Sequence, residues 1–465
     1  MKAGRVLLAL IWVFGLAAPA PAAIEFFGTA RVLPTYYHNF DFDDDTSDRA
    51  IINEGGFAKG EHIRAELRLG WLAKGDKWSV KMITEADVIL QKDTADRSFY
   101  VGSDKYDNPN TGGEFGIERV ELLYKFLPQL ELQTGWDIRA LDIKTGGLLF
   151  GDDHPFIGFR GQLAEKTRYE LLYLPIQNMS SITTDPFESD EINDWRVYSL
   201  KLNQKVGNFD LSPFYAYSDN DNREAKVHYF GFETLGKMGI FKPSFEVVFA
   251  DGEFDYGKDI SSMAAFAGLE LELNKAFNPY VAFRYTKGDD DAADDKVKGW
   301  VGITDIGRFT PLMGMDGGIL SEDFGQSYGA TLYSYSPERA PLKTGLPVDS
   351  YGGISNGGRG NNPGQRLLAV GARGDLSDWI DKFSYKTQVF FIWYDQTDNL
   401  NNKKNPGKKV DRYAGTTFDL QLSYALNEHF NVGYIFGIFQ PGSGLKDQFG
   451  NDPAITNCLA LTWTY

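Results

Sequence analysis

The sequence predicts an all-β fold, a transmembrane antiparallel β-barrel of about 18 strands, within a range of roughly 16 to 20. Segments of about ten residues alternate apolar and polar side chains, which is the pattern of a strand with two different faces. Charged residues occupy the second face of many segments, and segments repeatedly end in Tyr, Trp or Phe. Beyond the N-terminus no stretch has the roughly 18 uncharged apolar residues of a membrane-spanning helix, so a helical membrane protein is excluded.

The N-terminus has the pattern of a secretory signal. Lys2 and Arg5 precede the apolar run Val6–Ala18, and small residues follow around Ala20 and Ala22. This order predicts a signal peptide over residues 1–22, cleaved after Ala22, and export from a bacterial cytoplasm. A buried N-terminal helix is the alternative. The rest of the chain, 23–465, is expected to form one barrel domain.

Alternation is clear from the first strands onward. In residues 61–72, Ile63, Leu67 and Leu69 share a face, and basic and acidic residues take the other. The same pattern recurs down to 416–425, where Phe418 and Leu420 alternate with polar residues. The expected strands lie near 24–37, 61–72, 77–90, 116–127, 129–139, 155–163, 167–175, 195–203, 208–217, 226–236, 240–250, 262–273, 278–287, 364–374, 382–394, 412–425, 429–439 and 454–465.

The links between these strands alternate in length. Short links are expected at one end of the barrel, with long ones such as 38–60 and 91–115 opposite. An even strand number places both termini on the short-turn, periplasmic side. Residues 288–363 are too long for an ordinary loop and carry an apolar stretch, so they are the candidate constriction or plug. Tyr328–Ser336 within them is a possible additional strand.

Composition excludes several functions. The formal net charge of −17 and pI near 4.8 argue against nucleic acid as a partner, because phosphate binding needs a basic face. One cysteine, Cys458, excludes a disulfide framework and a multi-cysteine zinc site, and five scattered histidines make a histidine metal centre improbable. No histidine stands in a recognisable arrangement with a serine nucleophile, so catalytic residues are not expected and the chain is not predicted to be an enzyme. A resident metal site is not expected either.

Two acidic runs lie in expected long links, Asp41–Asp48 and Gly288–Asp295. They lack the glycine and distal glutamate of a calcium-binding loop. Solvated loops are the simpler interpretation. The alternatives are Mg²⁺ or Ca²⁺ bridging to lipopolysaccharide phosphates, or attraction of cations to the pore mouth.

Strand parity predicts the residues that line the interior. For each residue alone, a cross-strand ion pair is the simpler role, but together they predict a hydrated channel, since charges along a pore set its ion preference. The predicted pore-lining residues are Arg64, Glu66, Arg68, Lys81, Glu85, Asp87, Arg119, Glu121, Lys125, Asp137, Arg139, Arg160, Arg284, Arg373, Lys386 and Asp419.

The chain resembles a Gram-negative outer-membrane porin, with alternation throughout and a final strand ending in Trp463 and Tyr465. The terminal aromatic resembles the signal read by the barrel assembly machinery, which is therefore an expected partner together with outer-membrane lipid and lipopolysaccharide. The segment Leu132–Gly161 is similar to the alginate-export type of 18-stranded barrel. That resemblance implies a basic lumen for an anionic polysaccharide, with Arg139 and Arg160 placed to serve it.

The inward charges are about equally acidic and basic, which favours passive diffusion of small hydrophilic solutes or ions instead. An alginate-export-like or substrate-specific channel, and a barrel that sheathes a protein partner, are the alternatives. Monomer and trimer both remain open.

Overall fold

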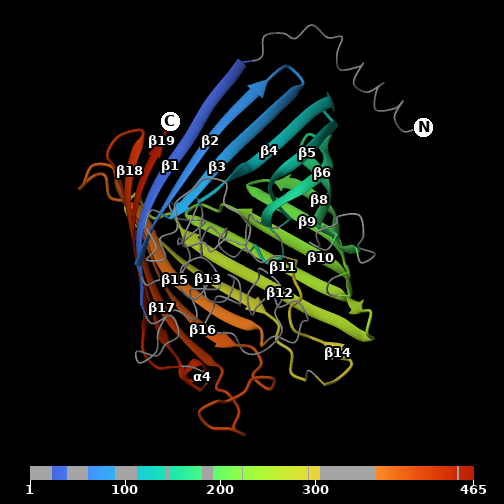
Figure 1. Cartoon of the computed structure of the whole chain (residues 1–465), viewed down its shortest axis with the longest axis vertical. Helices are drawn as coiled ribbons and strands as arrows, with labels where there is room; N and C mark the ends of the chain where they lie inside the picture. The colour runs from blue at the N-terminus through green and yellow to red at the C-terminus, as the bar shows by residue number, and fades with distance from the viewer. Residues whose placement is uncertain are drawn as a thin grey trace.

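Eighteen long antiparallel strands join edge to edge into a closed barrel in the computed structural model (Figure 1). The sheet contains a further, two-residue strand, β14, which pairs parallel to β12 and takes no part in closing the ring. The structure describes residues 23–38, 61–89, 113–141, 147–149, 151–180, 192–221, 224–291, 293–303, 363–447 and 450–465. The expected signal peptide, the Asp41–Asp48 run and Tyr328–Ser336 lie outside these residues.

The strands follow one another around the ring in chain order. The first nine are β1 (Ala23–His38), β2 (Glu61–Lys74), β3 (Trp78–Ile89), β4 (Gly113–Leu127), β5 (Leu130–Ala140), β6 (Gly151–Ala164), β7 (Thr167–Ser180), β8 (Ile192–Val206) and β9 (Phe209–Asn220). The others are β10 (Ala225–Gly236), β11 (Phe241–Phe254), β12 (Lys258–Leu271), β13 (Asn278–Thr286), β14 (Lys296–Val297), β15 (Gln365–Asp375), β16 (Phe383–Tyr394), β17 (Tyr413–Ala425), β18 (Phe430–Pro441) and β19 (Ala454–Thr464). One helical turn, α4 (Ser443–Lys446), follows β18.

The two ends of the strand series meet at a seam. Strand β1 pairs with β19 from Thr29 opposite Thr464 to His38 opposite Ile455. At the end of the seam, the Gly28 amide donates to the Tyr465 carbonyl at 3.2 Å and the Tyr465 amide donates back at 3.1 Å. Figure 1 shows β1 beside β19 along this edge. Closure satisfies strand N–H and C=O groups around the ring, which a sheet surrounded by lipid requires.

Each strand has one apolar and one mixed or polar face, as the alternation predicts. On β8, Leu200 is 38% exposed and points outward, whereas its neighbours Ser199 and Lys201 are 7% and 6% exposed and point inward. The outward faces of the other strands carry exposed Phe, Leu, Ile and Val in the same way, including Phe26, Leu69, Phe159, Phe249 and Phe283. An exposed apolar band around a barrel is typical of a surface that contacts lipid. No helix in the described part of the chain is long and apolar enough to cross a membrane.

The predicted all-β barrel of 18 strands is confirmed, and its strands lie where the alternation placed them. Two features differ from the expectation. The links β9–β10 and β11–β12 are short although they lie at the long-link end. Strand β14 was not predicted, because two residues are too few to show alternation.

Candidate functional site

The inner wall formed by β2, β3 and β4 carries a chain of ion pairs. Arg68 bonds Glu85 on the neighbouring strand, and its guanidinium lies 3.2 Å from Glu118. Glu118 also lies 3.6 Å from Arg119. A register shift between Ile83 and Thr84 marks a bulge in β4. Because of the bulge, the consecutive residues Glu118 and Arg119 both join the same ion-pair chain. In a regular strand two consecutive side chains point to opposite faces.

The same ion-pair chain continues across β5. Lys81 bonds Asp137 and lies 3.7 Å from Glu121. Arg119 lies 3.6 Å from Asp137, and Arg139 bonds Glu121. Asp137 is 6% exposed in its side chain, and the other four are 14–27% exposed. Basic and acidic groups therefore alternate along the wall, and each lies within 4 Å of a group of opposite charge.

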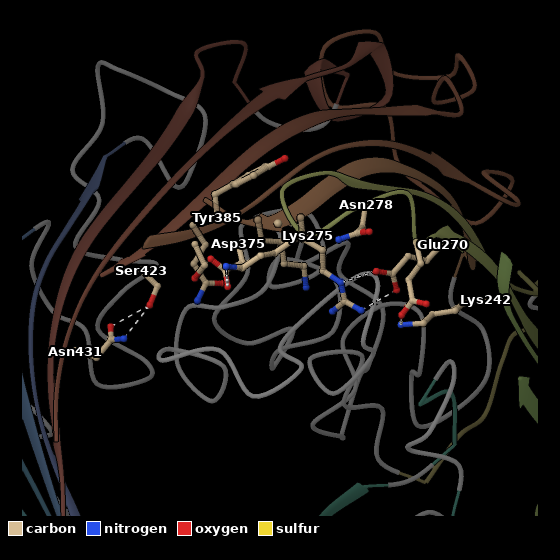
Figure 2. Close-up of a pocket in the computed structure, with 14 residues that line it drawn as sticks. Lys242, Glu270, Lys275, Asn278, Asp375, Tyr385, Ser423 and Asn431 are labelled. Carbon is tan, nitrogen blue, oxygen red and sulfur yellow. Dashed lines mark hydrogen bonds and ion pairs between the residues drawn. The ribbon is translucent and has the colours of Figure 1, made fainter. Parts of the chain in front are cut away.

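A cavity of about 610 Å³ lies against the inner wall at the short-turn end of β11 to β18 (Figure 2). Its floor includes a bidentate pair, in which Arg373 Nε and Nη2 lie 2.8 and 2.7 Å from the two Glu270 oxygens. Glu270 is 6% exposed beneath Arg373, which is 32% exposed. The lining residues are Lys242, Glu270, Glu272, Lys275, Asn278, Arg373, Gly374, Asp375, Ser384, Tyr385, Lys386, Gln421, Ser423 and Asn431.

Glu272 stands in the turn after β12, at the rim of this cavity. It bonds Lys237 and Lys242, and these two hydrogen bonds lower the pKa of the Glu272 carboxyl to about 2. Lys275 in the same turn lies 3.1 Å from Asp378 and 3.7 Å from Asp375. The charged groups of the rim are thus paired with one another.

Segments of two long links pack inside the long-link end of the barrel. Trp300, fully buried, donates its indole N–H to the Leu148 carbonyl at 3.3 Å and meets Tyr229 of β10 edge to face at 6.2 Å. The Ile303 amide donates to the Leu149 carbonyl at 3.2 Å. One link joins β5 to β6 and the other follows β13, so the two links contact each other inside the ring.

Buried charged groups of the wall hold the first of these links. Lys201 of β8 bonds Glu233 of β10 and donates to the Leu141 carbonyl at 2.6 Å. Glu246 of β11 is 0% exposed and accepts the Leu148 amide at 3.3 Å. A buried charge needs such partners, because its desolvation is otherwise uncompensated. These contacts fix the β5–β6 link against the wall between β8 and β11.

Asp395, just after β16, gathers the two ends of the link between β13 and β15. Its carboxylate accepts the Gly288 amide at 2.9 Å and the Tyr285 hydroxyl at 3.2 Å, and Arg366 donates to it at 2.9 and 2.6 Å. Its own amide donates to the Gly364 carbonyl at 3.4 Å. The long link therefore leaves and re-enters the barrel wall at one point.

The acidic run Gly288–Asp295 folds around a lysine of its own link. The Lys298 ammonium lies 2.6 Å from Asp290 and 3.4 Å from Asp294. Its hydrogen bond lowers the pKa of the Asp290 carboxyl, whereas the pKa of Asp294 is lowered first by the Lys296 backbone amide and then by Lys298. Burial raises the pKa of the neighbouring Asp289. In the described part of the chain no group of three or more His, Cys, Asp or Glu is arranged to hold a metal ion.

The structure brings seven of the predicted pore-lining residues into the ion-pair chain: Arg68, Lys81, Glu85, Arg119, Glu121, Asp137 and Arg139. Arg373 and Lys386 line the cavity. Arg160 is set apart and pairs with Glu131 at 2.5 Å. Lys125 is exposed near the short-turn end of β4.

Two predicted residues are buried deeper in the wall. Arg284 is 2% exposed, and Asp419, at 8%, accepts from Thr417 at 3.2 Å and from Gln388 at 3.4 Å. The side chains of Arg64, Glu66 and Asp87 lie outside the described residues. That the set lines a conducting pore stays a prediction.

Sequence reasoning missed Lys201, Glu233, Glu118 and Asp395. Lys201 and Glu233 alternate with Leu200 and Phe232, so strand parity alone would have found them. No local pattern reveals Asp395, whose partners are distant in the sequence.

The chain matches no protein-family model and no curated protein. Among solved structures it is similar to OccK9 (OpdG) from Pseudomonas aeruginosa, with a TM-score of 0.56, 11% identity, and 95% of this chain and 98% of that chain covered. It is equally similar to OccK2 (OpdF) from the same organism in complex with glucuronate, with a TM-score of 0.56, 12% identity and coverage of 95% and 97%. The outer membrane protein OpdK, also from Pseudomonas aeruginosa, has a TM-score of 0.53, 11% identity and coverage of 95% and 98%. These likenesses extend over almost the whole chain and show the barrel fold.

Proposed function

We propose that this protein is a passive channel of a Gram-negative outer membrane for small hydrophilic solutes or ions. One observation carries the proposal: the same closed barrel exposes Leu, Phe and Val outward and holds a chain of ion pairs on its inner wall. An apolar exterior suits lipid, and a charged interior suits water and polar solutes. A barrel of 18 strands is wide enough for an aqueous path between inserted segments.

The structural neighbours support this class of function. OpdK is described as an outer membrane protein, and OccK2 (OpdF) was solved with glucuronate, a small hydrophilic solute. We extend the outer-membrane location to this chain, with export through the signal peptide 1–22 and assembly through the C-terminal strand. A passive channel in the outer membrane requires no catalysis, so we propose that the protein is not an enzyme. Lipid hydrolysis by the purified protein would contradict this.

Export of an alginate-like polyanion is the less favoured alternative. It requires a basic lumen, whereas Arg139 bonds Glu121 and Arg160 pairs with Glu131 at 2.5 Å. Both arginines that the resemblance assigned to this role are therefore neutralised by carboxylates on neighbouring strands. Two of the solved structures to which the chain is similar are OccK9 (OpdG) and OccK2 (OpdF), and neither name points to polysaccharide export.

The proposal is tested by single-channel conductance of the mature protein in a planar bilayer under a salt gradient. We expect stable conductance steps, and the sign of the reversal potential reports which inward charges dominate. The absence of conductance steps from barrels that are shown to be folded would contradict the proposal. Co-purification of a tightly bound protein would then favour a barrel that sheathes a partner.

A further inference from the structure

The cavity at the short-turn end has two chemically different flanks. On the β11–β15 flank the charged groups are paired, Arg373 with Glu270 at 2.7 Å and Lys242 with Glu272. On the β16–β18 flank, the lining side chains are uncharged apart from Lys386: Ser384, Tyr385, Gln421, Ser423 and Asn431. Lys386, on β16 at the edge of this flank, stands opposite Arg373 of β15 and opposite Gln421 of β17 in the strand registers.

The uncharged flank is continuous across three strands. Ser384 of β16 stands opposite Ser423 of β17, and Ser423 reaches Asn431 of β18. Figure 2 shows Ser423 and Asn431 directed toward each other at one side of the cavity, away from Glu270 and Lys242. Asn431 Nδ2 and Ser423 Oγ lie 3.0 Å apart, and Ser423 Oγ and Asn431 Oδ1 lie 3.1 Å apart. This mutual contact orients both side chains before any solute arrives.

The hydrogen-bonding capacity of this flank exceeds what its internal contacts use. An Asn amide offers two donors and a carbonyl oxygen with two lone pairs, and a Gln amide offers the same. The uncharged side chains of this flank place donors and acceptors next to each other, which matches a hydroxyl-rich molecule, since each hydroxyl both donates and accepts. A volume of about 610 Å³ lies within the range of roughly 300 to 1,000 Å³ typical of small-molecule sites.

We propose that the β16–β18 flank is a binding subsite for the hydroxyl groups of a polyhydroxylated solute, such as a saccharide ring, on its path through the barrel. The subsite recognises hydroxyls rather than net charge. This inference rests on the proposed channel function and specifies a solute class for one part of its interior. It assigns recognition to Gln421, Ser423 and Asn431, none of which is in the predicted pore-lining set.

Binding is measured without transport, so that its failure is distinguishable from failure of the channel function. The full folded barrel in amine-oxide micelles, which contain no sugar, is titrated with methyl glucoside and followed by saturation-transfer NMR. Glucuronate and acetate are titrated in parallel, the first carrying a carboxylate in place of the hydroxymethyl group of the ring and the second lacking the ring. We expect methyl glucoside to bind and acetate to bind more weakly or not at all.

The test variant is Ser423→Ala with Asn431→Ala. Losing the two hydrogen-bonding side chains is expected to raise the dissociation constant of methyl glucoside roughly five-fold or more. The matched control is Ser212→Ala with Asn203→Ala, a Ser–Asn pair bonded at 2.8 Å across β8 and β9 that does not line the cavity. The control is expected to bind like the unsubstituted protein.

Three results would overturn the subsite: no binding of methyl glucoside, binding that requires the carboxylate of glucuronate, or equal weakening in both double variants. Circular dichroism of each variant checks that the barrel is folded. Conductance in the absence of sugar separately tests whether the barrel is open. A silent barrel that still binds methyl glucoside would keep the subsite and remove the channel function.

Discussion

Gly288 and Gly364, the residues at the two ends of the link between β13 and β15, lie against each other at the long-link rim. A Cβ on Gly364 would collide with the Gly288 nitrogen, and Gly364 has a left-handed φ of +62°. Only glycine fits both the conformation and the close approach. The link therefore begins and ends at one place in the wall, which Asp395 fastens through the Gly288 amide at 2.9 Å.

Asp395→Ala should destabilise the barrel by about 2–4 kcal/mol, because Arg366, Tyr285 and the Gly288 amide lose a buried acceptor together. The measurement is urea unfolding in lipid vesicles followed by Trp fluorescence. The matched control is Asp398→Ala, which like Asp395 lies in the link between β16 and β17. Asp398 pairs with Lys409 at the surface, and its side chain is 35% exposed. Surface pairs contribute about 0–1 kcal/mol, so a cost for Asp398→Ala equal to that of Asp395→Ala would refute the role of Asp395.

Excision of residues 289–363, with Gly288 joined directly to Gly364, should leave a folded barrel. The two glycines already touch, so the ends of the wall need little rearrangement. We expect conductance to rise, because the excised segment includes Trp300 and Ile303, which pack inside the ring. Single-channel recording measures this, and Trp300→Ala in the full chain shows how much the indole alone contributes. A folded excision variant with unchanged conductance would exclude the link as the constriction.

Replacing Lys201 by Met should cost about 3–5 kcal/mol of stability, since Glu233, 1% exposed, loses its buried cationic partner. The double variant Lys201→Met, Glu233→Leu removes both charges and should be more stable than Lys201→Met alone. Unfolding of the four proteins of this cycle in vesicles measures the coupling. Equal stability of the single and double variants would contradict a coupled pair. Loss of the bond to the Leu141 carbonyl should also make channel current noisier in both variants, because it frees the β5–β6 link.

The ion-pair chain predicts opposite shifts of ion selectivity. Glu121→Gln removes the carboxylate that faces Arg139 and Lys81, and should move the reversal potential in a KCl gradient toward anion preference. Arg139→Gln should move it toward cations. Glu428→Gln, 86% exposed in the turn between β17 and β18, is the control and should change it least. Shifts of the same sign for Glu121→Gln and Arg139→Gln would show that neither residue borders the ion path.

Acid should weaken the turn after β12 over a defined pH range. The pKa of Glu272 falls from 4.5 to about 2 in the folded state, because Lys237 and Lys242 bond the charged form. A lowered folded pKa gives stability that is present above pH 4.5 and is lost as the pH falls through about 2. Protein with Glu272→Gln should be less stable than the unsubstituted chain above pH 4.5, and the difference should vanish near pH 2. Unfolding at several pH values measures this, and the difference should be absent when Lys237 and Lys242 are both Met.

Alternation was sufficient to predict the strands, because an outward face in lipid and an inward face in a polar interior impose the same two-residue period throughout. Parity alone named seven residues of the ion-pair chain, Arg68 and Arg139 among them, but not their pairings. It failed at Glu118, where a bulge shifts one residue out of phase. It also failed at Asp395 and at the contact of Trp300 with Leu148, since these depend on where two links meet in space.

The seam between β1 and β19 sets the order of assembly. Strand β1 pairs with β2 on one edge and with β19 on the other. The pairing with β19, such as Thr29 with Thr464, can form only after the last strand has been synthesised. Until then both edges expose unpaired N–H and C=O groups that invite pairing with other chains. Contacts so distant in the sequence also form slowly. Shielding the free edge of β1 until β19 arrives is therefore expected to raise the yield of closed barrel.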